Sequence, residues 1–268
     1  MGRSADPASL RQGEIHVWTA QLLDDDEFAA ELIGVLDADE RARAARFRFE
    51  RHRSHFVQSH GITRRVLAAY AGIDAAALRF GYNPHGKPSL APAGHDLHFS
   101  LSHSADCCML AIRRGDPIGI DVEQLRDLPD ALDVARRQFT RSESQLLSRL
   151  DAAARRDAFF ALWTQKEAIV KALGGSLADY LDRLEFDLGP AGGVRLVSRD
   201  GDRSVGDQWS VVRIDCPRGY AAAMATCHGF RELAHFAWKA GLPPRLGQQS
   251  PRRDIVMRSM ADIRRPGL

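Results

Sequence analysis

The sequence predicts an α+β fold in which two halves each combine helices with strands. Alternation of polar and apolar residues favours strands on both sides of the turn at 115–117, and helical periodicity favours long helices at 50–71 and 152–173. The turn Gly115-Asp116-Pro117 separates the two sets, so it is the expected boundary between the halves. We find no sequence repeat of fixed short period.

The first half is expected to begin with a strand and to continue with three helices. Residues 14–21 alternate as a strand does, and Asp37 is a suitable first residue for a helix. Gly72 is the expected end of the long helix, and a turn is expected at 82–88. The elements predicted in this half are the strand 14–21, the helices 25–35, 37–47 and 50–71, and the strands 77–81, 97–103 and 107–113.

The second half is expected to follow a similar plan. Gly174-Gly175 is a typical helix end. The predicted elements are the strand 118–123, the helices 130–138, 141–149 and 152–173, and the strands 183–188, 193–198, 208–215 and 219–226. The chain after about Arg231 is rich in arginine and proline, and we expect an extension of marginal order there, with a short helix near 252–263.

Composition excludes several classes of protein. The 268 residues are 44% hydrophobic and 27% charged, which is typical of a globular chain rather than a disordered, collagenous or coiled-coil one. The apolar runs are too short for a transmembrane helix, and the N-terminus lacks the apolar core of a signal peptide. The four cysteines show no C-x-x-C spacing, so we expect a cytoplasmic protein. A net charge of +2 does not indicate nucleic acid, and no membrane partner is expected.

Arginine and histidine are concentrated between residues 39 and 65. Such a basic strip can bind a polyanionic small molecule, but it can equally be the solvent-exposed face of a helix. The charge run alone does not decide between these two interpretations.

The segment Gly119-Ile120-Asp121-Val122-Glu123 places two carboxylates on one predicted strand. Side chains alternate between the faces of a strand, so Asp121 and Glu123 are expected on the same face. Carboxylates that close repel each other unless a cation or a proton lies between them, and oxygen ligands beside a substrate phosphate suit Mg²⁺. The alternative is an exposed strand face that carries two charges.

The predicted helix at 152–173 carries Trp163, Glu167 and Lys171 at intervals of four residues, along one stripe. A carboxylate and an ammonium group are conspicuous on an otherwise aromatic and aliphatic helix. The alternative is an ordinary Glu–Lys pair of the kind that stabilises a helix by about 0.2–0.5 kcal/mol.

Two further motifs could bind phosphate groups. In the FSLSHS segment, Ser102 and His103 combine a hydroxyl with an imidazole, but no G-x-S-x-G elbow or third triad member supports a hydrolase. In the HGKP turn, Gly86 allows close backbone approach and Lys87 supplies a positive charge. Taken alone, each motif also fits a structural role, as a core histidine or an ordinary turn.

The order of the motifs is more specific than any one of them. R-F-R-F precedes the long first helix, and then G-K-P, F-S-L-S-H-S, G-I-D-V-E, F-T-x-x-E and W-x-x-K-E-A-x-x-K follow. This order resembles the 4′-phosphopantetheinyl transferase superfamily, in its surfactin-type branch with two fused halves, over about residues 14–228. That family transfers the phosphopantetheine arm of coenzyme A to a serine of an acyl or peptidyl carrier protein and releases adenosine 3′,5′-bisphosphate.

The resemblance implies roles for individual residues. Asp121, Glu123 and Glu167 match the family's metal-site carboxylates, so Mg²⁺ is the implied metal, with Mn²⁺ as an alternative. Glu167 would also be the base for the carrier serine, and Lys171 would stabilise or protonate the leaving bisphosphate. The positions that match contacts to coenzyme A are Arg43, Lys87, Ser102, His103, Asp121 and Lys171.

The resemblance also implies an architecture. Two similar α+β halves would be related by a pseudo-twofold axis, with the active site in the cleft between them. The expected parts are 1–116 with the coenzyme A phosphate contacts, 117–230 with the metal and catalytic residues, and a basic C-terminal extension at 231–268. Because both halves lie on one chain, a monomer is expected. Carriers of polyketide or non-ribosomal peptide synthesis are favoured, and they would dock near the helices at 130–150.

Two other interpretations remain open on the residues themselves. One is a Mg²⁺-dependent hydrolase of the coenzyme A or nucleotide pyrophosphate, which would use the same carboxylates with water as the nucleophile. The other is a coenzyme A-binding module without catalysis, in which Glu167 and Lys171 are a surface pair. Replacement of Glu167 by Gln would abolish turnover only if the protein is an enzyme.

Overall fold

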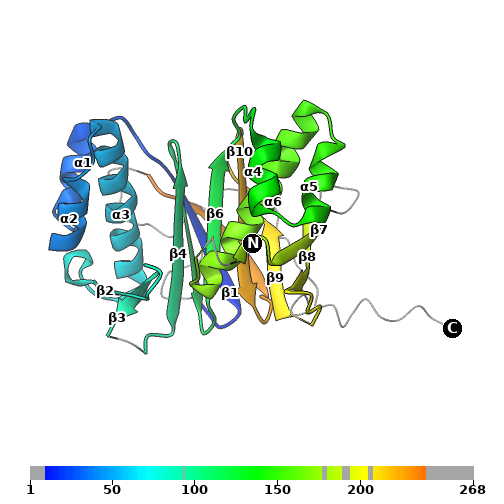
Figure 1. The fold of residues 1–268 in the computed structure, drawn as a ribbon. Helices are drawn as coiled ribbons and strands as arrows, with labels where there is room; N and C mark the ends of the chain where they lie inside the picture. Colours follow the sequence, from blue (N-terminus) through cyan, green and yellow to red (C-terminus); the bar gives the residue numbers. More distant parts are fainter. Residues whose placement is uncertain (1–9, 93, 177–179, 189–193, 205–207, 240–268) are drawn as a thin grey trace, which may run out of the picture.

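Strands occupy the middle of the molecule and helices lie at its two sides (Figure 1). In the computed structural model, the helices of the first half lie on one side of the strands and those of the second half on the other. The residues that the structure describes are 10–92, 94–176, 180–188, 194–204 and 208–239.

The same order of elements occurs twice along the chain. The first half contains β1 (Glu14–Gln21), α1 (Asp26–Ile33), α2 (Ala38–Ala44), α3 (Glu50–Ala71), a 3-10 turn (Ala75–Ala77), β2 (Arg79–Tyr82), β3 (Pro88–Ala91), β4 (Leu97–Ser104) and β5 (Cys107–Arg114). The second half contains β6 (Ile118–Gln124), α4 (Ala131–Gln138), α5 (Arg141–Ser148), α6 (Ala152–Leu173), β7 (Leu184–Leu188), β8 (Val194–Arg199), β9 (Trp209–Arg213) and β10 (Tyr220–Cys227). One more strand, β11 (Glu232–Ala237), follows them.

Strand pairing repeats as well. In one sheet β5 lies between β1 and β4, and in the other β10 lies between β6 and β9, with antiparallel pairing throughout these two sets. In the second sheet Asp121 lies opposite Ala223. The predicted fold class of two similar α+β halves is therefore confirmed.

Each half is built around a helix of 22 residues that ends at a glycine. Gly72 ends α3 with φ 68°, and Gly174 ends α6 with φ 70°. This left-handed conformation costs glycine little because it has no Cβ, and both helix ends were predicted from the sequence.

A buried cation–glutamate pair recurs at the same place in both halves. In the first half, Arg64 of α3 binds Glu40 of α2 at 2.6 Å (Nε to Oε2), and in the second half Lys166 of α6 binds Glu143 of α5 at 2.8 Å (Nζ to Oε2). Both glutamates also close a capping box at the start of their helix. Each cation donates further hydrogen bonds to two backbone carbonyls beyond its own helix, so it fixes the following loop as well.

Three serines of β4 hold the edge of one sheet against the edge of the other. They lie at alternate positions, so their side chains share one side of the strand. Each hydroxyl accepts a hydrogen bond from a backbone N–H of β6 in place of a backbone carbonyl. The pairs are Ser100 with Ile120, Ser102 with Val122 and Ser104 with Gln124, at 3.1, 3.3 and 3.1 Å.

An apolar cluster strengthens the same junction. It combines fully buried side chains from β1, β5, β6 and β10, so both halves contribute to it. Removing this surface from water favours the closed arrangement of the two halves. Its largest members include Ile15, Met109, Ile118, Ile120 and Met224.

Gly119 allows α6 to cross β6 in direct backbone contact. A Cβ at this position would lie 1.9 Å from the carbonyl oxygen of Ala168 and 2.5 Å from the nitrogen of Ala172. Both atoms belong to the α6 backbone, which cannot turn aside as a side chain can. The glycine of the G-I-D-V-E motif therefore brings α6, with its acid and its lysine, onto the strand that carries Asp121.

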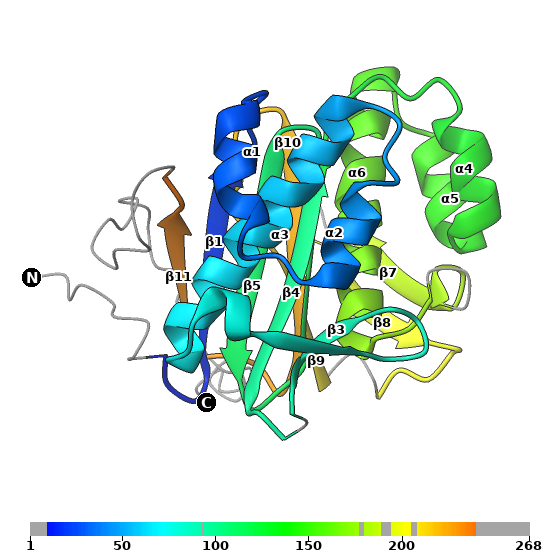
Figure 2. The same ribbon diagram turned by 90° about the vertical axis from the view of Figure 1, so that its left-hand side faces the viewer.

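Two strands were not expected from the sequence. We treated 231–268 as one extension, but β11 pairs in parallel with β1 (Figure 2), so the start of that extension was wrong. The physical reason is apolar packing, because Phe236 stacks on Trp18 with 4.8 Å between ring centroids. Strand β3 falls partly within a predicted turn, and it is only four residues long. The predicted helix near 252–263 lies outside the described residues.

A membrane span was not found. Among the residues that the structure describes, no helix combines the length and the apolar character needed to cross a bilayer.

We predict that Gly119→Ala destabilises the protein by about 1–3 kcal/mol, because the added methyl group overlaps the α6 backbone. Urea unfolding followed by circular dichroism measures the change. Gly34→Ala is the matched control, since a Cβ there meets no atom within 4 Å and the backbone is right-handed helical. Equal unfolding midpoints for the two variants would contradict this account of the β6–α6 contact.

Candidate active site

Three carboxylates meet where α6 crosses β6. Asp121 and Glu123 come from alternate positions of β6, and Glu167 comes from the facing side of α6. One ligand atom from each of the three lies within 4.8 Å of the others. The structure thus brings together the three residues that the sequence predicted as metal ligands.

Asp121 is the most enclosed member of this group, with 1% of its surface exposed. Its Oδ1 accepts hydrogen bonds from Lys171 Nζ at 2.6 Å and from Ser102 Oγ at 2.8 Å. Its Oδ2 is buried and has no hydrogen-bond partner among the described residues. A buried carboxylate oxygen without a partner is costly, so this atom is free to ligate a cation.

Glu123 is oriented by the last serine of β4. Ser104 Oγ donates to Glu123 Oε2 at 2.7 Å, while the same hydroxyl accepts from the β6 backbone. Burial raises the pKa of Glu123 and the Asp121 charge adds to this, although the Ser104 hydrogen bond acts against them. The Ser104 hydrogen bond therefore fixes the orientation of the Glu123 side chain.

The pKa values of both Glu167 and Lys171 are raised in this crowded site. Burial first, and then the Asp121 carboxylate, raise the pKa of Glu167 to about 7. The pKa of Lys171 is raised as well, because attraction by Asp121 and Glu167 outweighs the effect of burial. Lys171 Nζ lies 3.5 Å from Glu167 Oε2, so one ammonium group faces two of the three carboxylates.

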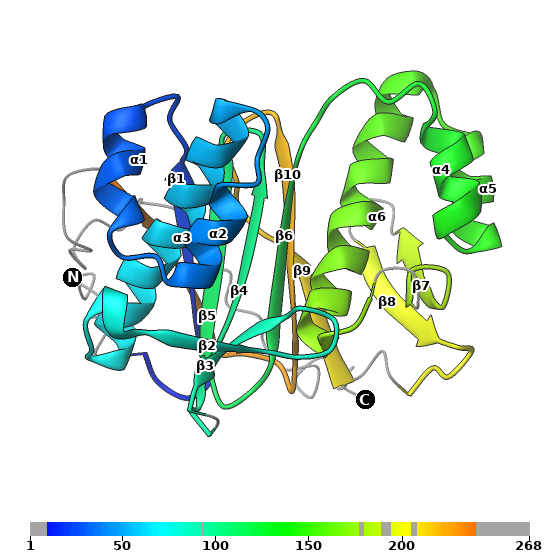
Figure 3. The ribbon, with the colours of Figure 1, turned by 60° about the vertical axis from the view of Figure 1, so that its left-hand side comes forward.

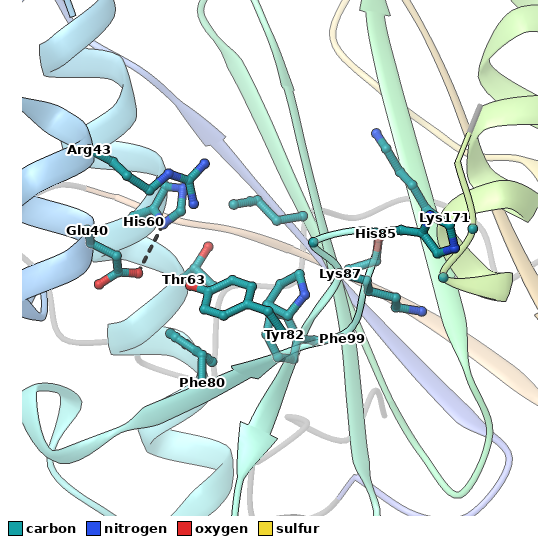
Figure 4. A pocket seen from close by; sticks show the side chains of 16 residues that line it. Glu40, Arg43, His60, Thr63, Phe80, Tyr82, His85, Lys87, Phe99 and Lys171 are labelled. Atoms are coloured by element: carbon teal, nitrogen blue, oxygen red, sulfur yellow. Dashed lines mark hydrogen bonds and ion pairs between the residues drawn. The ribbon is translucent and has the colours of Figure 1, made fainter. Parts of the chain in front are cut away.

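A cavity of about 300 Å³ (Figure 4) reaches Lys171, the lysine that pairs with Asp121 and Glu167. The first half supplies most of its lining, from α2, α3, the β2–β3 hairpin and β4, while the end of α6 closes it. Both halves therefore contribute to one site. The residues that line the cavity are Glu40, Arg43, His60, Thr63, Phe80, Tyr82, His85, Gly86, Lys87, Pro88, Phe99, Ser100, Leu101, Lys171, Gly174 and Gly175.

Basic side chains lie on opposite sides of this cavity. Arg43 and His60 lie together on the α2–α3 side, whereas Lys87 and Lys171 lie on the other (Figure 4). Glu40 also reaches the cavity, but it is bound by Arg64 and by His60, whose Nδ1 lies 3.0 Å from Glu40 Oε1. Because Glu40 is already paired with these two side chains, it does not oppose an anionic ligand in the cavity.

Lys87 bridges the halves through backbone carbonyls. Its Nζ donates to Ile118 O at 3.2 Å and to Ala172 O at 3.0 Å, which ties the HGKP turn to β6 and to the end of α6. Burial lowers the pKa of this lysine to about 8. The sequence predicted a phosphate contact here, and the structure adds a bridging role that only the fold reveals.

His103 points away from the carboxylates, because it alternates with Ser102 on β4. The side chain of His103 is exposed to solvent, whereas that of Ser102 is buried. His103 therefore lies at the surface of β4 and not in the carboxylate cluster.

Sequence reasoning missed much of the cavity wall. His60 and Thr63 are spaced three residues apart on α3 and share one face of the helix, but nothing in the sequence identified that face as a cavity wall. Tyr82 and Gly174 come from a hairpin and a helix end that are distant in sequence. Only the fold brings these residues together.

Two family models match this chain. The family model described as "4'-phosphopantetheinyl transferase superfamily" matches residues 117–225. A second model, described as "4'-phosphopantetheinyl transferase, N-terminal", matches residues 23–114.

Relatives named 4'-phosphopantetheinyl transferases give the same result. The 4'-phosphopantetheinyl transferase HetI of Nostoc sp. is 33% identical over 233 residues, which cover 86% of this chain and 92% of that relative. A 4'-phosphopantetheinyl transferase of Bacillus subtilis is 32% identical over 171 residues, 63% of this chain and 74% of that relative. Among solved structures, a Bacillus anthracis holo-(acyl-carrier-protein) synthase in complex with CoA (3',5'-ADP) is 20% identical with a TM-score of 0.34, over 42% of this chain and 96% of that one.

The chain therefore belongs to the 4′-phosphopantetheinyl transferase superfamily, in its surfactin-type branch, and the predicted resemblance is confirmed. It is an enzyme of this class, and its general reaction is the transfer of a 4′-phosphopantetheinyl group.

We predict that Glu167→Gln stabilises the metal-free protein by about 1–3 kcal/mol at pH 8. The pKa of Glu167, about 7, is higher than the ordinary value of 4.5, so between these two pH values the unfolded chain loses the proton first and unfolding is favoured. The gain should grow between about pH 4.5 and pH 7, stay level above pH 7 and fade below pH 4.5. Urea unfolding in EDTA at several pH values measures it.

The matched control for this prediction is Glu31→Gln, which changes an exposed carboxylate of α1. Its unfolding free energy should follow that of the wild type at every pH. If Glu167→Gln also left the free energy of unfolding unchanged at pH 8, the three carboxylates would not repel one another as described.

Proposed function

We propose that this enzyme transfers the 4′-phosphopantetheine arm of coenzyme A to a serine of an apo acyl or peptidyl carrier protein, with Mg²⁺, and releases adenosine 3′,5′-bisphosphate. The observation that carries the proposal is the carboxylate cluster, with its unpartnered Asp121 Oδ2, linked through Lys171 to a cavity with basic side chains between the halves. Each part of this arrangement matches one part of the substrate.

The cavity suits the nucleotide end of coenzyme A. Phosphate groups would meet the positive charges of Arg43, Lys87 and Lys171, and the Ser102–His103 pair lies on the adjoining strand. Phe80 and Tyr82 provide aromatic surface on which a purine can pack. Most of these contacts come from the first half, which accords with the division of roles expected for residues 1–116 and 117–230.

The donor set suits a hard divalent cation. Asp121, Glu123 and Glu167 offer only oxygen ligands on a partly open site, which favours Mg²⁺ and accommodates Mn²⁺. When bound, the metal would neutralise charge on the pyrophosphate of coenzyme A. Asp121 would hold it through Oδ2, since Oδ1 already binds Lys171 and Ser102.

Glu167 would accept the proton of the carrier serine. A carboxylate with a pKa of about 7 is a better base at neutral pH than an ordinary glutamate. As the serine oxygen bonds to the β-phosphorus, the bond from that phosphorus to the bridging oxygen breaks. The proton goes to Glu167, and Lys171 stabilises the negative charge that develops on the departing bisphosphate.

The cellular setting is part of the same proposal. Both halves of one chain line the cavity, which supports a monomer as the active unit. All four cysteines are free, which suits a reducing compartment such as the cytoplasm. The surfactin-type resemblance favours carriers of polyketide or non-ribosomal peptide synthesis.

Intact-protein mass spectrometry tests the proposal. An apo acyl carrier protein and an apo peptidyl carrier domain are each incubated with the enzyme, coenzyme A and Mg²⁺. We expect a mass gain of one phosphopantetheine, which is lost with EDTA and with a carrier whose acceptor serine is replaced by Ala. Release of phosphopantetheine to water without transfer would indicate the hydrolase instead.

Glu167→Gln should lower the transfer rate about 10²–10⁴-fold, because it removes the proposed base and one metal ligand. Glu31→Gln is again the control and should transfer at the wild-type rate. Binding of coenzyme A, measured by calorimetry in EDTA, should change little in Glu167→Gln. Transfer by that variant at the wild-type rate would contradict the assigned role.

A further inference from the structure

The loop between α2 and α3 exposes an unusual combination of side chains. Phe49 is 58% exposed and Phe47 is 41% exposed, although they are two residues apart. Arg46, Arg48 and Arg51 are exposed around them. We call these five residues the Arg–Phe patch.

Exposed aromatic rings of this size are costly to leave in water. Burying a phenylalanine side chain is worth about 1.5–3 kcal/mol, so a pair of exposed rings with a polar rim is typical of an interaction surface. The other large apolar side chains that are exposed in the described part of the chain are Ile33, Ile73 and Tyr82. None of those three has a second exposed ring beside it in sequence.

The charges of the patch favour an acidic partner. Arg51 is paired with Asp24, but Arg46 and Arg48 form no ion pair within the described part of the chain. Arg48 lies over the Phe49 ring, 5.5 Å from its centroid, so charge and apolar surface are presented together. Arginine and aromatic residues are the types most enriched at the energetically important centres of interfaces.

The patch also lies close to the active site. Phe47 packs on Phe56 with 5.3 Å between ring centroids, and Phe56 stacks on His60 at 4.0 Å. His60 lines the cavity, so two ring contacts connect the patch to it. Figure 3 shows α2 and the start of α3 on the side of their layer that is nearer to α6. A protein bound here can present a side chain at the mouth of the site.

We propose that the Arg–Phe patch docks the carrier protein, and that it does so through acidic and apolar side chains near the carrier's acceptor serine. Phe47 and Phe49 would meet the apolar side chains, and Arg46 and Arg48 would pair with acidic groups around them. This inference rests on the proposed function and adds a surface to it.

The patch differs from the docking region expected from the sequence, near the helices at 130–150. We expected exposed apolar residues on the helices at 130–150, but Ala131, Ala135 and Leu147 of α4 and α5 are buried against α6. No large apolar side chain of these two helices is among the exposed ones in the described structure. What α4 and α5 expose is chiefly charge, including Arg137.

Steady-state kinetics with two variable substrates tests the proposal. Phe49→Ser and Arg48→Glu each change an exposed side chain outside the cavity, so both variants should fold, which thermal unfolding checks. We expect the KM for an apo peptidyl carrier domain to rise about tenfold in each. The KM for coenzyme A, and the kcat at saturating carrier, should stay at wild-type values.

Two matched controls sharpen the test. Ile73→Ser removes another exposed apolar side chain, and Arg137→Glu reverses a charge on α4, where the sequence placed docking. Both should leave the KM for the carrier unchanged. An unchanged KM in Phe49→Ser and Arg48→Glu, or a rise confined to Arg137→Glu, would overturn the inference while transfer itself persists. A wild-type enzyme that loads no carrier would overturn the proposed function, and this inference with it.

Discussion

The hydroxyl groups of β4 determine how the two halves meet and how the active site is oriented. Ser102 and Ser104 each accept a backbone N–H from β6 and donate to a carboxylate of the same strand, Asp121 or Glu123. A serine hydroxyl can do both at once, because it has one donor and two acceptor positions. The serine hydroxyls that join the two sheets therefore also orient two of the three carboxylates. Separating the halves would disorganise the site directly.

The three carboxylates of the site still repel one another in the folded protein. Asp121, Glu123 and Glu167 converge with one ammonium group, Lys171, facing two of them. The direct backbone crossing at Gly119 maintains this arrangement, since α6 has no freedom to move away from β6 while its apolar face is buried. Burial, and then the charge of Asp121, raise the pKa of Glu167, so repulsion between the carboxylates contributes to that shift. A cation between the carboxylates would remove their mutual repulsion. The relief of this repulsion would add to the free energy of binding the cation.

The features that could be predicted from the sequence are those that depend on residues close together in the chain. Strand alternation placed Asp121 and Glu123 on one face, and helix periodicity aligned Glu167 with Lys171, so the carboxylate cluster needed only one correct contact between two elements. The cavity wall needed several, because His60 and Tyr82 come from separate elements of the first half. Strand β11 was missed because its partner β1 lies at the other end of the chain. The bridging hydrogen bonds of Lys87 depend on distant carbonyls in the same way.

The repeated cation–glutamate pair shows which residue of the K-E-A-x-x-K motif holds the fold together and which belongs to the active site. Arg64 with Glu40 and Lys166 with Glu143 hold equivalent helices in the two halves, and both cations are the fifteenth residue of a 22-residue helix. Within K-E-A-x-x-K, therefore, Lys166 is structural, whereas the next residue, Glu167, turns toward the strand. The first half keeps the pair but has an arginine, Arg65, at the position that corresponds to Glu167. The two halves thus share one way of fixing a helix, and only the second places an acid beside a strand that carries carboxylates. The side chains of the first half instead supply most of the cavity lining.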